Sequence, residues 1–526
     1  MPGSLRFGML TSIFVACSNS SYAQDEMQPL SAIDWLSRSV ERTELTANGS
    51  LPGVSIIDPN EPAVSSEVDA HNVTVTALDA PSLDLIGLLA PEFTGLPKSL
   101  WSGSSSVELA SLVRAERIET LPALRELIAT LMLAEADPPF GAADDGQLFL
   151  ARVDKLLDLG ALNEAQALLE AADPTSAETF RRWFDVSLLT GTEAETCTVL
   201  RLKPELAPTY LARVFCLARV GQFDTAVLVL NTARALGDIT EAEDELLSRF
   251  LDPDLFEDEP PLTPPQRTSP LLFRLYDAIG ERLSTTNLPR AFAHADLHGT
   301  ASWRNRMEAA ERLARVGAID PNHLHALYTE RAPAASGGVW DRAAAFQRLD
   351  FALQDNDVSL AAEALPQAWD EAKRIRIENA FAAMFATRLR DASLPDGVSD
   401  TVFLISLLSD DYTDAARTYL PRSLDQLFLI ELALDSSAGF TSVPSSPTAR
   451  AVAEGFSVTP KQTDLTVLAD DGKTGEAILR AIELFSESSL GDPRGVTEAL
   501  ILLRHVGLDD IARRAALEYL ILDRGV

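Results

Sequence analysis

Apolar residues recur every three or four positions along most of the chain after Ser106. Clear examples of this spacing are Leu109, Leu112, Val113, Leu124, Leu127, Ile128 and Leu131. This period places one apolar stripe on each helix. Short breakers such as Asp137-Pro-Pro and Lys203-Pro204 separate segments of about 12 residues, which can pack only as antiparallel neighbours. The pattern therefore predicts an all-α fold built from helical hairpins.

The composition changes before and between these helical regions. Residues 24–106 open with one short helix, expected at 31–45, and continue as a Pro- and Ser-rich extended arm. Within this arm, residues 72–78 alternate like a short strand. Residues 252–270 are acidic and contain six prolines, which indicates a linker because proline removes a backbone donor and clashes with the preceding turn. Helical regions are expected at 107–251, 271–435 and 448–526, with a loop at 436–447.

One short pattern occurs at four helix corners. An apolar residue ends a helix, Gly follows, another apolar residue fills the corner, and Asp or Asn stands near the start of the next helix. The four glycines are Gly160, Gly221, Gly317 and Gly507. Glycine readily takes the left-handed conformation that ends a helix, and Asp or Asn is expected to cap the next one. The pattern predicts helix-turn-helix hairpins that can stack.

Between Gln147 and Gly237 the sequence resembles the tetratricopeptide repeat (TPR) family. The resemblance is carried by Leu159-Gly160-x-Leu162-x-Glu164-Ala165 and by a hairpin at 208–237 with Tyr210, Gly221, Phe223 and Ala226 in the expected places. The four glycines keep no fixed period, so the expected fold is an irregular α-α superhelix, a TPR-like solenoid with an extended N-terminal arm. A non-repeating helical bundle with the same capping chemistry is the alternative.

The first 23 residues are typical of a secretory signal peptide. Arg6 is the only charge before residue 25, residues 9–16 form an apolar run, and small residues precede a cleavage site between Ala23 and Gln24. The run is shorter than the roughly 20 residues that span a bilayer. We expect a protein exported to a bacterial periplasm, without a membrane span after signal removal. Lipidation of Cys17, within a near-lipobox, is the alternative.

Cleavage after Ala23 would leave Cys197 and Cys216 as the only cysteines. An even pair in an oxidising compartment suggests a disulfide. Cys197 lies in a helix expected at 193–202 and Cys216 in one expected at 208–220, so an antiparallel arrangement would bring them together. The alternative is a pair of buried free thiols.

The formal net charge is −34, from 44 Lys and Arg against 78 Asp and Glu. A surface this acidic repels a phosphate backbone and an anionic membrane. Nucleic acid is therefore not expected as a partner.

Few residues offer catalytic or metal-binding chemistry. His294 and His298 stand four apart and would share one helical face, which makes them weak candidates for a metal site, but no zincin motif accompanies them. No catalytic residues and no cofactor are expected. Solenoids commonly bind along a long face, so the expected function is a non-catalytic scaffold that binds a protein or peptide partner in the cell envelope. The alternative is an α/α-toroid enzyme acting on envelope polysaccharide.

Overall fold

A computed structural model describes residues 35–36, 82–141, 146–298, 301–434, 439–457, 459, 461–489 and 491–522. Within these residues the fold is all-helical, with two isolated β-bridges and no β-strand. Its α-helices are α1 (Pro91–Thr94), α2 (Ser106–Ala115), α3 (Pro122–Leu133), α4 (Gln147–Leu159), α5 (Leu162–Ala171), α6 (Ala177–Thr190), α7 (Glu193–Leu202), α8 (Tyr210–Arg219), α9 (Phe223–Leu236), α10 (Glu241–Leu251), α11 (Pro270–Ala278), α12 (Ala293–Leu297), α13 (Trp303–Ala314), α14 (Pro321–Thr329), α15 (Val339–Gln354), α16 (Val358–Arg374), α17 (Glu378–Asp391), α18 (Asp396–Leu407), α19 (Tyr412–Thr418), α20 (Leu424–Ala433), α21 (Pro447–Gly455), α22 (Asp464–Asp470), α23 (Thr474–Ser488), α24 (Arg494–His505) and α25 (Asp509–Ile521).

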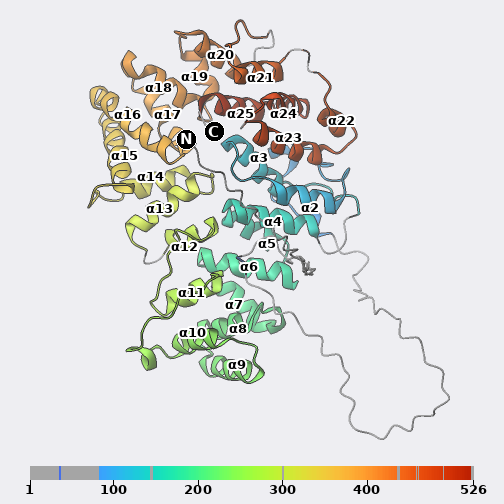
Figure 1. The fold of residues 1–526 in the computed structure, drawn as a ribbon, viewed down its shortest axis with the longest axis vertical. Helices are drawn as coiled ribbons and strands as arrows, with labels where there is room; N and C mark the ends of the chain where they lie inside the picture. Colours follow the sequence, from blue (N-terminus) through green and yellow to red (C-terminus); the bar gives the residue numbers. More distant parts are fainter. Residues whose placement is uncertain are drawn as a thin grey trace, which may run out of the picture. The chain divides into compact units, whose positions relative to one another are not determined.

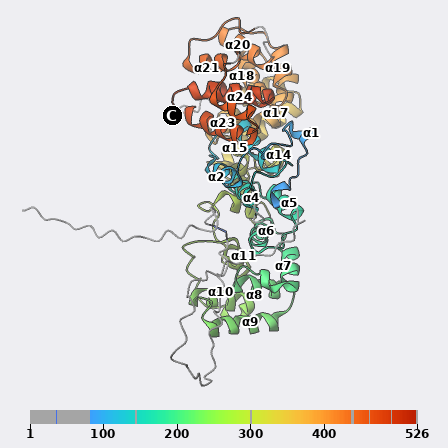
Figure 2. The same cartoon turned by 90° about the vertical axis from the view of Figure 1, so that its right-hand side faces the viewer.

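Most helices that are consecutive along the chain pack against one another (Figure 1). Their apolar residues form one large core cluster and a small second one around α12 and α13. Three successive hairpins, α4–α5, α6–α7 and α8–α9, turn at Gly160, Gly191 and Gly221. All three glycines have φ between 78° and 80°, as a left-handed helix end requires. Gly191 is a corner that the four-place sequence pattern did not include. It gives these hairpins a nearly even spacing, and α8, α9 and α10 lie together in both views (Figure 2).

The caps at the predicted corners differ from expectation at three of four places. Asp320 caps α14 as predicted, because its side chain accepts a hydrogen bond from the Asn322 amide. At α5, α9 and α25 the capping position is instead occupied by Ala161, Gln222 and Leu508, none of which makes a side-chain cap. The acidic or amide residue lies inside the first turn, where an acidic side chain still interacts favourably with the helix N-terminus.

The predicted arm is wrong for residues 82–106. This stretch contains a 3-10 helix at Leu83–Leu85, helix α1 and the fully buried Trp101. Apolar residues without helical spacing, such as Leu96 and Leu100, are buried through tertiary contacts that no local period reveals.

The predicted linker at 252–270 is correctly free of α-helix before Pro270, yet it packs against its neighbours. A 3-10 helix occupies Pro253–Phe256. Arg249 donates to the Pro260 carbonyl, and Glu281 accepts from the Leu262 amide at 2.7 Å. Residues of α10 and of the segment after α11 thus form hydrogen bonds to the backbone of this stretch, so it does not act as a free spacer.

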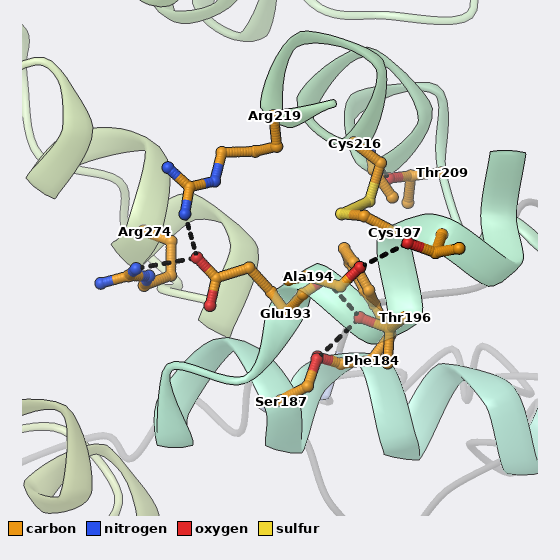
Figure 3. The surroundings of a disulfide bond; sticks show 12 residues. Phe184, Ser187, Glu193, Ala194, Thr196, Cys197, Thr209, Cys216, Arg219 and Arg274 are labelled. Atoms are coloured by element: carbon orange, nitrogen blue, oxygen red, sulfur yellow. Dashed lines mark hydrogen bonds and ion pairs between the residues drawn. A yellow bond between two sulfur atoms is a disulfide. The ribbon is translucent and has the colours of Figure 1, made fainter. Parts of the chain in front are cut away.

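Cys197 and Cys216 form the expected disulfide between α7 and α8 (Figure 3). Helix α7 has the predicted bounds, and a short 3-10 helix at Pro204–Leu206 connects it to α8. Beside the bridge, the buried Glu193 pairs with Arg219 and Arg274 at 3.0 and 3.1 Å. These two ion pairs link α7 to α8 and α11.

Helices from both ends of the described sequence also pack together. Helix α3 contacts α25 and α2 contacts α23 (Figure 1). We call this interface the N–C seam. Its polar contacts include Ser104 to Glu476 at 2.8 Å and Arg514 to Glu126 at 2.6 Å. In a repeat array each hairpin contacts only its neighbours, so the seam is a feature that the repeat interpretation lacked.

Several sequence predictions fall on residues outside the described ranges. They are the signal peptide at 1–23 with its cleavage site at Ala23 and Gln24, the lipidation candidate Cys17, and the strand at 72–78. Of the helix predicted at 31–45, the two described residues, Trp35 and Leu36, lie in a turn and a bend rather than a helix. Trp35 packs edge-on against Phe292.

Across the described ranges, no helix combines the length and apolar character needed to cross a membrane.

Candidate functional site

A pocket of about 300 Å³ lies beside the N–C seam and is walled by helix corners. We call it the junction pocket. Corners α4–α5, α13–α14, α16–α17 and α18–α19 contribute to it, together with the sides of α3, α17 and α25. Its walls are mostly small or aliphatic, and they include Ala129, Ala161, Val316, Ala318, Ile319, Ala380, Ala383 and Leu408. Residues far apart in sequence therefore converge on one concave surface.

Arginine dominates the charged lining of the junction pocket. Arg125, Arg315, Arg376 and Arg514 line it, against the two carboxylates Glu126 and Asp410. The site thus carries a local excess of positive charge in a chain whose net charge is −34.

The arginines differ in how they are held. Arg514 donates to Glu126 at 2.6 Å and lies 3.9 Å from Asp410, so one guanidinium faces both acidic residues of the lining. The Nε of Arg315 donates to the Ile375 carbonyl at 2.8 Å, which ties corner α13–α14 to corner α16–α17. These contacts place fixed guanidinium donors around the pocket.

Arg376 has an unusual backbone conformation. Its φ is 60°, and it occupies the place in corner α16–α17 that Gly160 and Gly317 occupy in their corners. The left-handed conformation costs a non-glycine residue roughly 1–2 kcal/mol. The Arg376 side chain is exposed and makes no hydrogen bond or ion pair with the described part of the chain. The Arg376 side chain therefore forms no contact of these kinds that would stabilise the fold.

Glu518 lies behind the pocket, at the contact between α25, α3 and α17. It is 2 % exposed and accepts hydrogen bonds from the Ala123 amide at 2.9 Å and from Asn379 Nδ2 at 2.7 Å. Burial raises the pKa of Glu518 to about 7, despite these bonds and the nearby charges of Arg514 and Arg125. Asn379 lines the pocket, and its Oδ1 is buried without a hydrogen-bond partner among the described residues.

The residues of this site are suited to binding a ligand. Guanidinium groups supply several directed donors and a permanent charge, and the alanine-rich walls accept apolar groups. A glycan-cleaving site would need a pair of carboxylates in acid and base roles. The two carboxylates that line the junction pocket both lie within 4 Å of Arg514, and no aromatic side chain of the described residues lines it.

The weak metal candidates do not line this pocket and do not share a helical face. His294 is buried in α12, and its Nε2 lies 2.6 Å from the Gly160 carbonyl. Burial lowers the pKa of His294 to about 4. Helix α12 ends at Leu297, so His298 follows in extended backbone and is exposed. The predicted one-face arrangement is therefore wrong, and no group of three metal-ligating residues occurs within the ranges described above.

Sequence reasoning singled out Leu159 and Gly317 as corner residues but missed the arginines that line the junction pocket. Arginines 125, 315 and 514 lie in ordinary amphipathic stretches, where a solvated role is the default expectation. One local signal was present: Ile375-Arg376-Ile377 has the spacing of the glycine corners with Arg in the glycine position.

Comparison of the chain with protein-family models, with curated proteins and with solved structures gives no match.

Proposed function

We propose that this protein is a non-catalytic scaffold of the cell envelope that binds a segment of a protein or peptide partner in the junction pocket. The observation that carries the proposal is the convergence of four arginines and small apolar walls on one pocket built from helix corners. Pockets that combine apolar walls with a few directed polar groups are typical binding sites.

The proposal includes the finer architecture expected from the sequence, an irregular TPR-like α-α superhelix. Support comes from three successive hairpins with glycine corners at Gly160, Gly191 and Gly221. It also includes export to a periplasm, which is supported by the signal-like N-terminus and by the disulfide between Cys197 and Cys216.

The polysaccharide-acting enzyme has less support. The N–C seam is compatible with a toroid, because such a fold must bring its first and last helices into contact. However, Glu126 and Asp410 both lie within 4 Å of Arg514, an arrangement that does not separate them into acid and base roles. We therefore favour binding over catalysis.

The test is site-specific photo-crosslinking in the source cells. A photoreactive amino acid replaces Ala383, an exposed residue that lines the pocket. The matched control replaces Ala326, an exposed alanine of α14 that does not line it. We expect one protein adduct at position 383, mapped by mass spectrometry to a single partner segment, and its loss when that segment is added as a synthetic peptide. No adduct, or equal adducts at both positions, would contradict the proposal.

A further inference from the structure

The residues that line the junction pocket also indicate which chemical groups its ligand carries. We infer that it recognises acidic side chains, Asp or Glu, of a peptide segment with apolar neighbours, and that Arg376 and Arg315 are the principal contacts. This inference rests on the proposed function, because it names the partner chemistry for the same pocket.

The first support is the position of two guanidinium groups. Arg315 donates through Nε to the carbonyl of Ile375, the residue that immediately precedes Arg376. The terminal nitrogens of Arg315 make no hydrogen bond to the described residues, and the Arg376 side chain makes none either. Two neighbouring residues at the pocket wall thus offer donor groups that the fold leaves for a ligand, in the planar geometry that matches carboxylates.

The second support is the backbone of Arg376. Four non-glycine residues have positive φ in the described ranges, namely Asp173, Asn356, Arg376 and Ser393. Asp and Asn tolerate this conformation and Ser is small, whereas Arg376 alone carries a long side chain. Non-glycine residues in strained backbone conformations cluster at ligand sites, and the corner uses the backbone of Arg376 but not its side chain. A contact between the guanidinium of Arg376 and a ligand gives this position a role.

The third support is the electrostatic environment. Burial lowers the pKa of Arg312, the positive charges of Arg290 and Arg315 lower it further, and Asp296 opposes this shift. Of these three arginines, Arg315 lines the pocket, and its neighbouring cations favour an anion beside it.

The other residues that line the pocket indicate which class of anion it binds. Glu126 and Asp410 oppose a multiply charged phosphate or sulfate more strongly than they oppose a single carboxylate. The aliphatic walls at Val316, Ile319 and Ala380 suit side chains that flank the acidic residue. An acidic residue with apolar neighbours in a peptide satisfies both conditions.

The experiment measures fluorescence anisotropy of two labelled peptide pools with the full chain. Both pools are octapeptides that are N-acetylated and C-amidated. Alternating positions carry Glu in one pool and Gln in the other, and the positions between them carry varied apolar residues. We expect the Glu pool to bind and the Gln pool to bind at least tenfold more weakly, as loss of a charge-assisted hydrogen bond implies.

Arg376→Gly is the diagnostic variant, because glycine accepts the left-handed backbone and the fold is retained. It should weaken binding of the Glu pool about tenfold without lowering the melting temperature. Arg374→Ala is the matched control, since Arg374 is an exposed arginine two residues away that does not line the pocket. It should bind as the unmodified chain does.

Equal binding of both pools, binding by neither pool, or full binding by Arg376→Gly would overturn the inference. Failure of this inference is distinguishable from failure of the proposed function. If the photo-crosslinked partner segment at position 383 is not acidic, only the ligand chemistry is wrong. If no adduct forms there, the binding function itself is wrong.

Discussion

Substitution of Glu518 tests how the buried contact between α25, α3 and α17 is held. Glu518→Gln removes the ionisable group while keeping its shape. The glutamine carbonyl can accept from the Ala123 amide, and its NH2 group can donate to Asn379 Oδ1 after the Asn379 amide turns over. Both hydrogen bonds therefore survive, so the substitution isolates the effect of charge.

The magnitude follows from the pKa of Glu518, which burial raises from 4.5 to about 7. The folded protein then holds this proton more tightly than the unfolded chain does. The stabilisation from the protonated group is fully present below pH 4.5 and is lost as pH rises through about 7. At about 1.4 kcal/mol per pKa unit, the unmodified chain loses about 3 kcal/mol that the glutamine variant keeps.

Urea unfolding followed by circular dichroism at about pH 4.5 and about pH 8 measures this difference. The stability of Glu518→Gln relative to the unmodified chain should rise by about 3 kcal/mol between these conditions. Glu116 lies near the same seam, and burial raises its pKa to about 8. Because Glu116 titrates in both proteins, its contribution cancels in the difference between their stabilities. Glu363→Gln, at an exposed carboxylate of α16, is the control and should show no such change. A stability difference for Glu518→Gln that does not vary with pH would refute the reasoning.

Three further predictions concern other parts of the chain. Replacing both Cys197 and Cys216 by Ala should lower the unfolding free energy by about 3 kcal/mol, as the loop-entropy estimate for a 19-residue separation gives; an unchanged urea midpoint would contradict this. Gly475→Ala should lower the melting temperature, because its Cβ would lie 2.5 Å from the Trp101 ring, whereas Gly397→Ala, with no atom within 4 Å, should not. Intact mass measurement of the mature protein should place its first residue directly after Ala23, and a lipidated Cys17 would contradict that.

Much of the helical architecture could be predicted from local sequence. The bounds of α7, the corner at Gly317 and the pairing of Cys197 with Cys216 follow from apolar period, glycine and proline positions, and cysteine count. Each of these depends on residues that are close in sequence. Prediction failed for residues 82–106, because Trp101 is buried against Gly475, a residue that lies far along the chain.

The candidate site was hardly accessible to sequence reasoning. Arg376 could have been noticed as an arginine in a glycine corner, but nothing local relates it to Arg315 or Arg514. Their convergence depends on which corners and helices meet, and that is decided by long-range packing.

The sequence by itself determined the class of structure, because helix period and corner glycines act over a few residues. Only the tertiary structure decided that α3 meets α25, that Glu518 is buried between them, and that arginines from separate corners share a pocket. The physical reason is that burial and convergence are properties of contacts between distant segments, whereas sequence patterns report only which face of each helix is apolar.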